Sequence, residues 1–68
     1  MDRYPINSGH IVSIGYENGI LEVKFKDARI YQYRGVPEHV YRELMLASSK
    51  GAYLNKCIKG TYPSSEIR

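Results

Sequence analysis

The 68-residue sequence has a single cysteine, Cys57, and no tryptophan. One cysteine excludes an internal disulfide, so folding depends on a small packed core, which at this size supplies ~3–5 kcal/mol. No apolar run approaches the ~20 residues of a membrane span. The opening Met1-Asp-Arg-Tyr-Pro5 lacks the basic start and apolar stretch of a signal peptide. We therefore expect a soluble protein in a reducing, cytoplasmic setting, without membrane association.

Residues suited to a catalytic or metal site are also scarce. His10 and His39 each stand alone, without the spacing of metal ligands or of a nucleophile and its base, and we expect both at the surface. Cys57 falls on the apolar side of a predicted helix, where cysteine behaves as a small hydrophobe. Paired carboxylates in separate environments are missing. The sequence therefore predicts a protein that is not an enzyme and uses no cofactor or metal.

The composition is that of an ordinary folded domain, with 43% hydrophobic and 25% charged residues. The formal net charge is +3, a modest excess of cations. Because a basic surface raises the local concentration of polyanions, this charge favours an anionic partner.

The dipeptide Asn18-Gly19 separates two runs of alternating apolar and polar residues. It is a strong hairpin signal because a type I′ turn needs positive φ at both central residues. The turn predicts a register in which three apolar pairs share one face: Tyr16 with Leu21, Ile14 with Val23, and Val12 with Phe25. Such a hairpin suits a sheet that is covered on one side.

The opposite face of this sheet is predicted to be mostly polar and is a second candidate binding surface. Its predicted members are Ser13, Glu22, Lys24, Lys26, Gln32 and Arg34, together with the apolar Ile11 and Ile30. The cations favour a second basic surface, whereas the two isoleucines and the edge strands favour a dimer or partner interface.

The second hairpin allows two registers. A two-residue turn at Asp27-Ala28 places Gln32 and Arg34 on the apolar face, while a three-residue turn at 27–29 places Tyr31 and Tyr33 there. We favour the three-residue turn, which pairs Phe25 with Tyr31 and Val23 with Tyr33, because burying unpaired polar groups costs several kcal/mol.

Two helices are predicted after the third strand. Pro37 suits the first position of a helix, and Glu38 complements its dipole. The inward stripe of this helix is Val40, Tyr41, Leu44 and Ala47 or Ser48. Ser48-Ser49 ends it and caps a second helix, whose apolar face is Tyr53, Leu54, Cys57 and Ile58 and which ends at Gly60.

The predicted fold is thus α+β: a three-stranded antiparallel meander with two C-terminal helices packed on one face. We expect residues 1–68 to form one domain, with an ordered core over about 10–62 and flexible segments at 1–9 and 63–68.

Several short motifs along residues 11–62 occur in a distinctive order: Ile14-Gly15-Tyr16, Leu21-Glu22-Val23-Lys24-Phe25, Tyr31-Gln32-Tyr33, Val36-Pro37 with Val40-Tyr41, Ala47-Ser48-Ser49-Lys50-Gly51, Tyr53-Leu54-Asn55, Ile58 and Tyr62. In this order they resemble the KTSC domain, a small family named after a C-terminal extension of some lysyl-tRNA synthetases and also found as short bacterial and phage proteins. Ala28 departs from the glycine expected in the second turn. The resemblance implies little about function, since for this family RNA binding has only been suggested.

Tyr31 and Tyr33 have two interpretations. Aromatic side chains on a sheet stack bases in readers of single-stranded RNA. Under the favoured register, however, the two rings lie beneath the helices, with their hydroxyl groups at the rim of the core. We therefore favour a structural role for both tyrosines.

The candidate binding site is the basic second helix. Its predicted nucleic-acid contacts are Ser49, Lys50, Gly51, Asn55, Lys56 and Lys59, with Arg42 or Arg34 nearby. A phosphate is expected near Ser49, Lys50 and the amide of Gly51, with Lys56 and Lys59 following the backbone. The alternative is an ordinary amphipathic helix with solvated lysines. This Ser-Lys-Gly segment lacks the glycine spacing of a phosphate-binding loop.

The leading hypothesis is therefore a non-catalytic module that binds RNA or tRNA weakly and in a salt-dependent manner. The alternative is a protein-interaction module, either a homodimer or a regulatory partner's docking domain, that uses the exposed sheet face or an edge strand.

Overall fold

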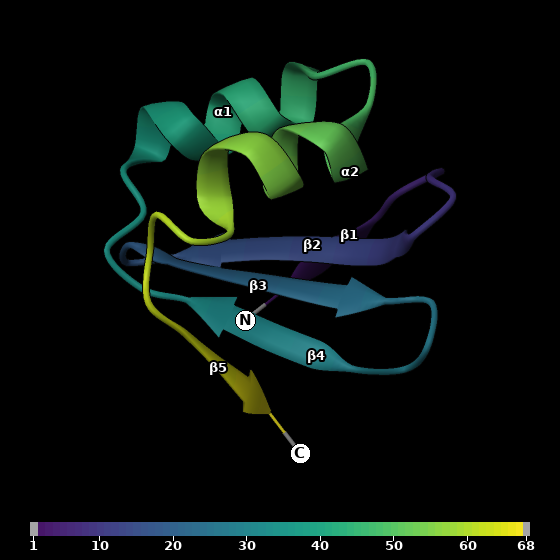
Figure 1. The fold of residues 1–68 in the computed structure, drawn as a ribbon, viewed down its shortest axis with the longest axis horizontal. Helices are drawn as coiled ribbons and strands as arrows, with labels where there is room; N and C mark the ends of the chain where they lie inside the picture. Colours follow the sequence, from purple (N-terminus) through teal and green to yellow (C-terminus); the bar gives the residue numbers. More distant parts are fainter. Residues whose placement is uncertain (1, 68) are drawn as a thin grey trace.

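The structure is a computed structural model that describes residues 2–67. In chain order its elements are β1 (Arg3–Pro5), β2 (Ile11–Glu17), β3 (Ile20–Phe25), β4 (Ile30–Tyr33), α1 (Glu38–Leu46), α2 (Lys50–Tyr53), the π-helical turn η1 (Leu54–Ile58) and β5 (Ser64–Ile67). The strands form one antiparallel sheet in the order β1-β2-β3-β4-β5. The helices lie together over one face of this sheet (Figure 1). The α+β class and the one-sided helical layer agree with the prediction.

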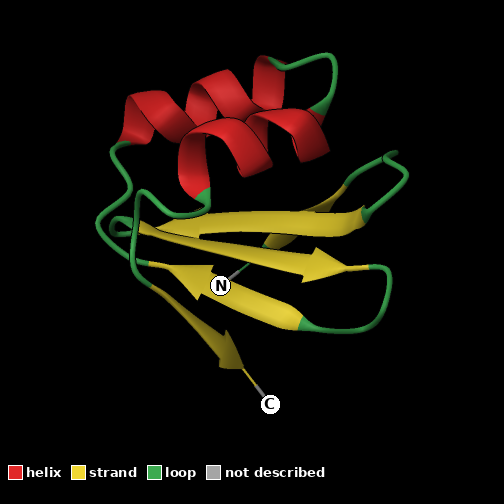
Figure 2. Cartoon of the chain, viewed as in Figure 1, coloured by secondary structure: helices red, strands yellow, loops and turns green. Residues whose placement is uncertain are grey.

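The sheet has five strands, so the prediction of three was wrong. The two additional strands, β1 and β5, lie at the edges and come from the segments predicted to be flexible (Figure 2). Tyr4 pairs with Ile14, and Ser65 pairs with Gln32. Strands of three and four residues are too short to show a clear alternation of apolar and polar residues. They are held in extended form by backbone pairing with the neighbouring strands. Met1 and Arg68 lie outside the described residues.

The hairpin of β2 and β3 turns at Asn18 and Gly19, both with positive φ, as predicted. Tyr16 faces Leu21 and Ile14 faces Val23, also as predicted. The pairing then shifts by one residue between Ile11 and Ser13, so Ile11 rather than Val12 lies opposite Phe25.

This bulge at Val12 corrects two predictions about side-chain direction. An extra residue in one strand reverses the alternation beyond it. Ile11 is consequently fully buried, whereas Val12 is 38% exposed. Ile11 therefore belongs to the core and not to the exposed sheet face.

The hairpin of β3 and β4 has the predicted loop length but a different position. Its loop is Lys26–Ala28, closed by a hydrogen bond from the Phe25 amide to the Arg29 carbonyl oxygen at 2.9 Å. Val23 therefore pairs with Tyr31 and Leu21 with Tyr33, two residues away from the predicted register. The tyrosines face the helices as expected, since a shift of two residues preserves the face. Ala28 takes the positive φ of 73° that the end of such a loop needs.

The helices begin and end close to the predicted positions. Pro37 has extended backbone geometry and occupies the N-cap position of α1, not the first helical position that was predicted. The hydroxyl oxygen of Ser49 accepts a hydrogen bond of 3.3 Å from the Ala52 amide and so caps α2. Gly60, with φ of 81°, follows η1 and reverses the chain towards β5.

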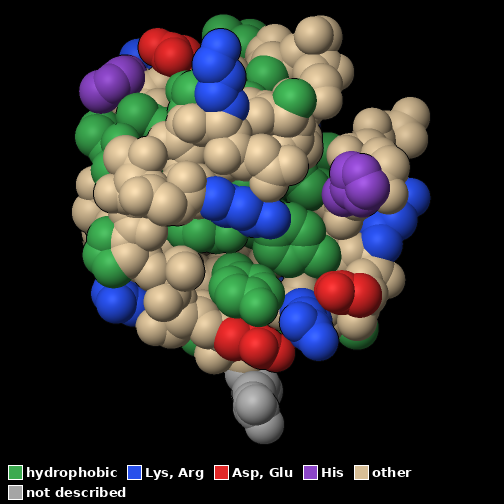
Figure 3. Space-filling view, in the orientation of Figure 1, with side chains coloured by type: hydrophobic (Ala, Val, Ile, Leu, Met, Phe, Trp, Pro, Cys, Tyr) green, Lys and Arg blue, Asp and Glu red, His purple; other side chains and the backbone are tan. Residues whose placement is uncertain are grey.

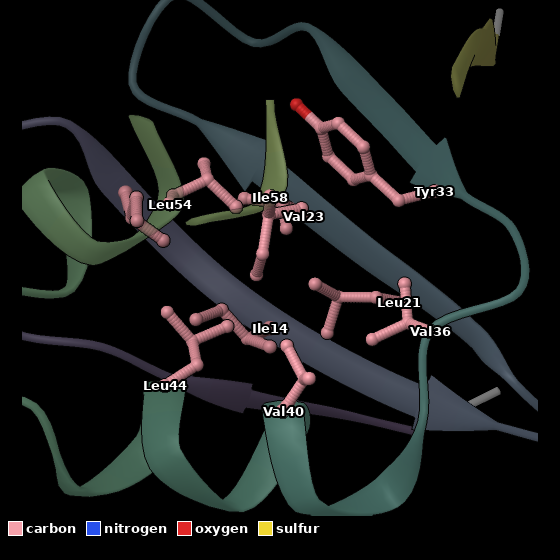
Figure 4. Close-up of a cluster of buried hydrophobic side chains, with 10 residues drawn as sticks. Ile14, Leu21, Val23, Tyr33, Val36, Val40, Leu44, Leu54 and Ile58 are labelled. Atoms are coloured by element: carbon pink, nitrogen blue, oxygen red, sulfur yellow. The ribbon is translucent and has the colours of Figure 1, made fainter. Parts of the chain in front are cut away.

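The core lies between the sheet and the helices (Figure 4). It consists of Ile11, Ile14, Leu21, Val23, Tyr33, Val36, Val40, Leu44, Leu54 and Ile58. Val40 and Leu44 enter it from α1, whereas Leu54 and Ile58 enter it from η1. Over residues 2–67, no helix has the length and apolar character needed to cross a membrane.

Candidate nucleic-acid interface

A groove of about 710 Å³ opens between the second helical segment and the β3–β4 hairpin. Its lining residues come from three parts of the chain and are His10, Ile11, Phe25, Lys26, Asp27, Arg29, Tyr31, Tyr33, Gly51, Leu54, Asn55, Lys59, Gly60 and Ser64. Figure 3 shows this face, where basic side chains border hydrophobic surface between the helical layer and the sheet. The groove thus combines aromatic, cationic and amide groups.

Aromatic side chains form the sheet side of the groove. The Phe25 and Tyr31 rings lie with centroids 5.8 Å apart and planes at 79°, an edge-to-face arrangement. Both side chains are only partly buried. Tyr33 is 3% exposed, and burial raises the pKa of its hydroxyl group. The two tyrosines of the Tyr31-Gln32-Tyr33 segment therefore differ: Tyr33 belongs to the core, and Tyr31 reaches the groove.

The π-helical turn η1 directs Asn55 and Lys59 towards this groove. The amide of Lys59 donates to the carbonyl oxygen of Leu54 at 2.8 Å, five residues back. Leu54 and Ile58 are fully buried. The residue that follows each of them, Asn55 or Lys59, lines the groove. The Lys59 ammonium group lies 5.2 Å from the centroid of Phe25, within the range of a cation–π interaction.

The β3–β4 loop supplies further charges. The guanidinium of Arg29 lies 3.7 Å from a carboxylate oxygen of Asp27, but both side chains are about 60% exposed. Such a surface pair contributes little stability and leaves Arg29 available to a ligand. The Tyr31 hydroxyl, followed by the charges of Asp27 and Glu66, raises the pKa of Arg29. Among the lining residues, Lys26, Arg29 and Lys59 outnumber the single carboxylate of Asp27.

The predicted contact residues fall into two groups. Gly51, Asn55 and Lys59 line the groove, and Lys56 is exposed on the same helical segment. The Lys50 ammonium donates to the carbonyl oxygen of Ala47 at 3.1 Å, and the Ser49 hydroxyl caps α2. Ser49 and Lys50 instead border a separate polar hollow of about 220 Å³, together with Asn7, Ser8, Gly9 and Ser48.

The two arginines predicted near the site lie elsewhere. Arg42 forms an ion pair with Glu38 at 3.2 Å on the exposed side of α1. Arg34 donates to the Ser65 hydroxyl at 2.8 Å and so joins β4 to β5. Neither arginine lines the groove.

The sheet face opposite the helices has different charged residues from those predicted, since Arg3 lies on it and Lys26 does not. Glu22 accepts from Gln32 at 2.9 Å and pairs with Arg3 at 3.3 Å. Lys26 lies in the β3–β4 loop and borders the groove.

Three residues that line the groove were not among the contacts predicted from the sequence: Phe25, Lys26 and Arg29. Phe25 was recognised only as a core residue, and Lys26 only as part of the opposite face. The available signal was a pair of cations at the second predicted turn, Lys26 and Arg29, close to the aromatic strand end at Phe25.

The described residues hold no group of three His, Cys, Asp or Glu side chains able to bind a metal ion. His10 lies at the border of the groove, His39 is exposed on α1, and Cys57 is partly buried.

Comparison with known proteins identifies the family. The KTSC domain model matches residues 7–62. A crystal structure of a KTSC domain protein from Yersinia pestis matches with a TM-score of 0.95 and 40% sequence identity, covering 98% of this chain and 97% of that one. A protein from Tsukamurella paurometabola is 33% identical over an alignment of 57 residues that covers 81% of this chain and 85% of that protein. The chain therefore belongs to the KTSC domain family.

Proposed function

We propose that this KTSC domain is a non-catalytic, cytoplasmic binding module that contacts RNA through phosphate groups at the groove. The observation that carries the proposal is the convergence of Lys59 from the end of η1 with Lys26 and Arg29 from the β3–β4 loop. Lysine and arginine side chains supply most of the affinity of proteins for nucleic-acid phosphates.

The neighbouring groups support the same ligand class. The Asn55 amide lies beside Lys59 along the groove and offers both a donor and an acceptor. Lys56, exposed on the same helical segment, extends the cationic surface. A few phosphate contacts of this kind produce weak affinity, about 10⁻⁴–10⁻⁶ M at physiological salt.

A salt titration tests this proposal. We expect single-stranded RNA and tRNA to bind at low salt, and affinity to fall as salt rises. Lys59→Gln and Lys26→Gln should each weaken binding and reduce the salt slope by about 0.7 for a single strand. Lys24→Gln is the matched control, because Lys24 follows the buried Val23 on β3 and points to the other face of the sheet.

Two results would reject the proposal. One is the absence of RNA binding at low salt. The other is a Lys24→Gln variant that weakens binding as much as the two groove variants do, since the contact would then be unrelated to the groove.

An exposed apolar residue at one edge of the sheet, Ile67, favours a second candidate, a protein-interaction module. Ile30 pairs with Ile67 across β4 and β5, and β5 is an edge strand with exposed side chains. Edge strands of this kind pair with other chains unless they are protected. Ile67→Lys should then abolish a dimer or a partner complex, whereas Lys59→Gln should leave it intact.

A further inference from the structure

We propose that the groove receives one unpaired nucleotide, whose base stacks on Tyr31 and whose phosphate lies at Lys59. This inference rests on the proposed RNA contact and adds the form of the ligand: a nucleotide with its base free, and not a base-paired duplex. The same chemistry is offered by a free mononucleotide and by a single-stranded segment of RNA.

The shape of the site favours an unpaired base. A volume of about 710 Å³ lies within the usual range for small-ligand pockets. The residues that line it come both from the helical layer and from the sheet, so the rings lie in a groove with two walls. Paired bases in an A-form helix keep their faces stacked on one another, so only an unstacked base can place a face against a protein ring.

The two rings have different roles. Lys59 covers one side of Phe25, so this ring positions the ammonium group. Tyr31, nearly perpendicular to Phe25 and partly exposed, has the ring that remains for stacking. A base parallel to Tyr31 would stand nearly perpendicular to Phe25, in the same edge-to-face relation that the two side chains already adopt.

The distribution of charge places the phosphate at the helical side of the groove. Asp27 and Glu66 lie near Arg29, and Glu66 pairs in register with Tyr31. These carboxylates offset part of the positive charge of Arg29, whereas no salt bridge among the described residues engages Lys59. Asn55 also lines the groove, and its amide offers a donor and an acceptor for the edge of the base.

The experiment compares three probes on the full chain: a short single-stranded oligo(A), a blunt RNA hairpin duplex, and free AMP. We expect oligo(A) to bind more tightly than the duplex. Tyr31→Leu should weaken oligo(A) roughly 5- to 150-fold, the usual cost of losing one stacked base. Tyr31→Phe keeps the ring and should bind like wild type, and circular dichroism should show that both variants are folded.

A second measurement uses the wild-type protein, so its result does not depend on whether Tyr31→Leu folds. The ring-proton NMR signals of Tyr31 should shift when oligo(A) or AMP is added. Binding of AMP with the same shift, without binding of oligo(A), would support a mononucleotide site and reject RNA as its source.

Other outcomes separate this inference from the proposed function. If RNA binding depends on Lys59 while Tyr31→Leu binds like wild type, or the duplex binds as tightly as oligo(A), then stacking is overturned and the phosphate contact stands. If none of the three probes binds at low salt, both proposals fail.

Discussion

The hydroxyl group of Tyr16 donates a hydrogen bond of 2.6 Å to the main-chain carbonyl oxygen of Val36, twenty positions further along the chain. The amide of Val36 in turn donates to the carbonyl oxygen of Gly19 at 2.9 Å. The Tyr16 ring also stacks on Tyr41 of α1, with centroids 4.7 Å apart and planes at 9°. These contacts join the first hairpin to the segment that leads into α1 and hold that helix against the sheet.

Removing this hydroxyl should lower stability. We expect Tyr16→Phe to reduce the free energy of unfolding by about 0.5–1.5 kcal/mol, because a partly buried hydrogen bond to Val36 is lost. Urea denaturation measures the change. Tyr4→Phe is the control, since the Tyr4 side chain is 58% exposed and its substitution should stay within about 0.5 kcal/mol of wild type. Equal effects of the two substitutions would contradict a specific role for the Tyr16 hydroxyl.

Because of the bulge in β2, we expect substitutions at Ile11 and Val12 to differ in their effect on the free energy of unfolding. Ile11→Val removes one buried methylene equivalent and should cost about 0.5–1.5 kcal/mol. Val12→Ala removes more atoms but from an exposed side chain, so it should change the unfolding free energy by no more than about 0.5 kcal/mol. Chemical denaturation of both variants checks this. The reverse order would mean that Val12 faces the core, as in a strand without a bulge.

Because Ala28 has an unfavourable backbone conformation, a substitution at this position should stabilise the protein. Its φ of 73° lies in the left-handed region, which costs a non-glycine residue about 1–2 kcal/mol. Ala28→Gly should therefore raise the unfolding free energy by up to about 1 kcal/mol, after the added flexibility of the unfolded chain is subtracted.

Gly35 and Gly9 provide matched tests of this reasoning. A Cβ at either position meets no atom within 4 Å, but only Gly35 has a positive φ, 74°. Gly35→Ala should therefore cost up to about 1 kcal/mol, after the reduced flexibility of the unfolded chain is taken into account. Gly9→Ala should cause no loss of thermal stability. A destabilising Gly9→Ala would show that side-chain contacts matter more than φ in these comparisons.

The raised pKa of Tyr53 predicts that the protein loses stability at alkaline pH. Burial first, and then the hydrogen bond to Glu43 and the charge of that carboxylate, raise the pKa of Tyr53 from its ordinary value of 10.0 to about 12. The unfolded chain therefore loses this proton at lower pH than the folded protein does. The contribution of Tyr53 is fully present below pH 10 and is lost as pH rises towards about 12.

Spectrophotometric titration of the tyrosines measures this shift. Glu43→Gln should bring the Tyr53 titration closer to its ordinary pKa, because the carboxylate acceptor and its charge are removed. Tyr53→Phe should reduce the decline in stability over the same pH range. If Glu43→Gln leaves the titration unchanged, the hydrogen bond is not a cause of the shift.

The elements that the sequence predicts correctly depend on neighbours along the chain. Asn18-Gly19 specifies a turn through its own backbone preferences, and the alternation beside it specifies the apolar face. Ser49 caps the second helical segment through the amide of Ala52, three residues on. The edge strands were missed for the opposite reason: their order comes from backbone pairing with β2 and β4, not from their own pattern.

The candidate site was predicted only in part, for a similar reason. Asn55 and Lys59 were recognised because basic and amide residues gather in one short segment. The position of Lys59 over the Phe25 ring depends on the π-helical turn and on the register of the β3–β4 hairpin. Lys50, Arg42 and Arg34 belong to the same basic composition, but local partners engage them elsewhere.

Short-range backbone preference and periodicity in the sequence encode the first turn, the inward face of β3 and β4, and the order of the three central strands before α1 and α2. The bulge at Val12, the two edge strands and the contact of Lys59 with Phe25 depend on the folded arrangement. Each of these arises from hydrogen bonding or packing between segments distant in the chain, and such contacts leave no periodic trace in either segment alone.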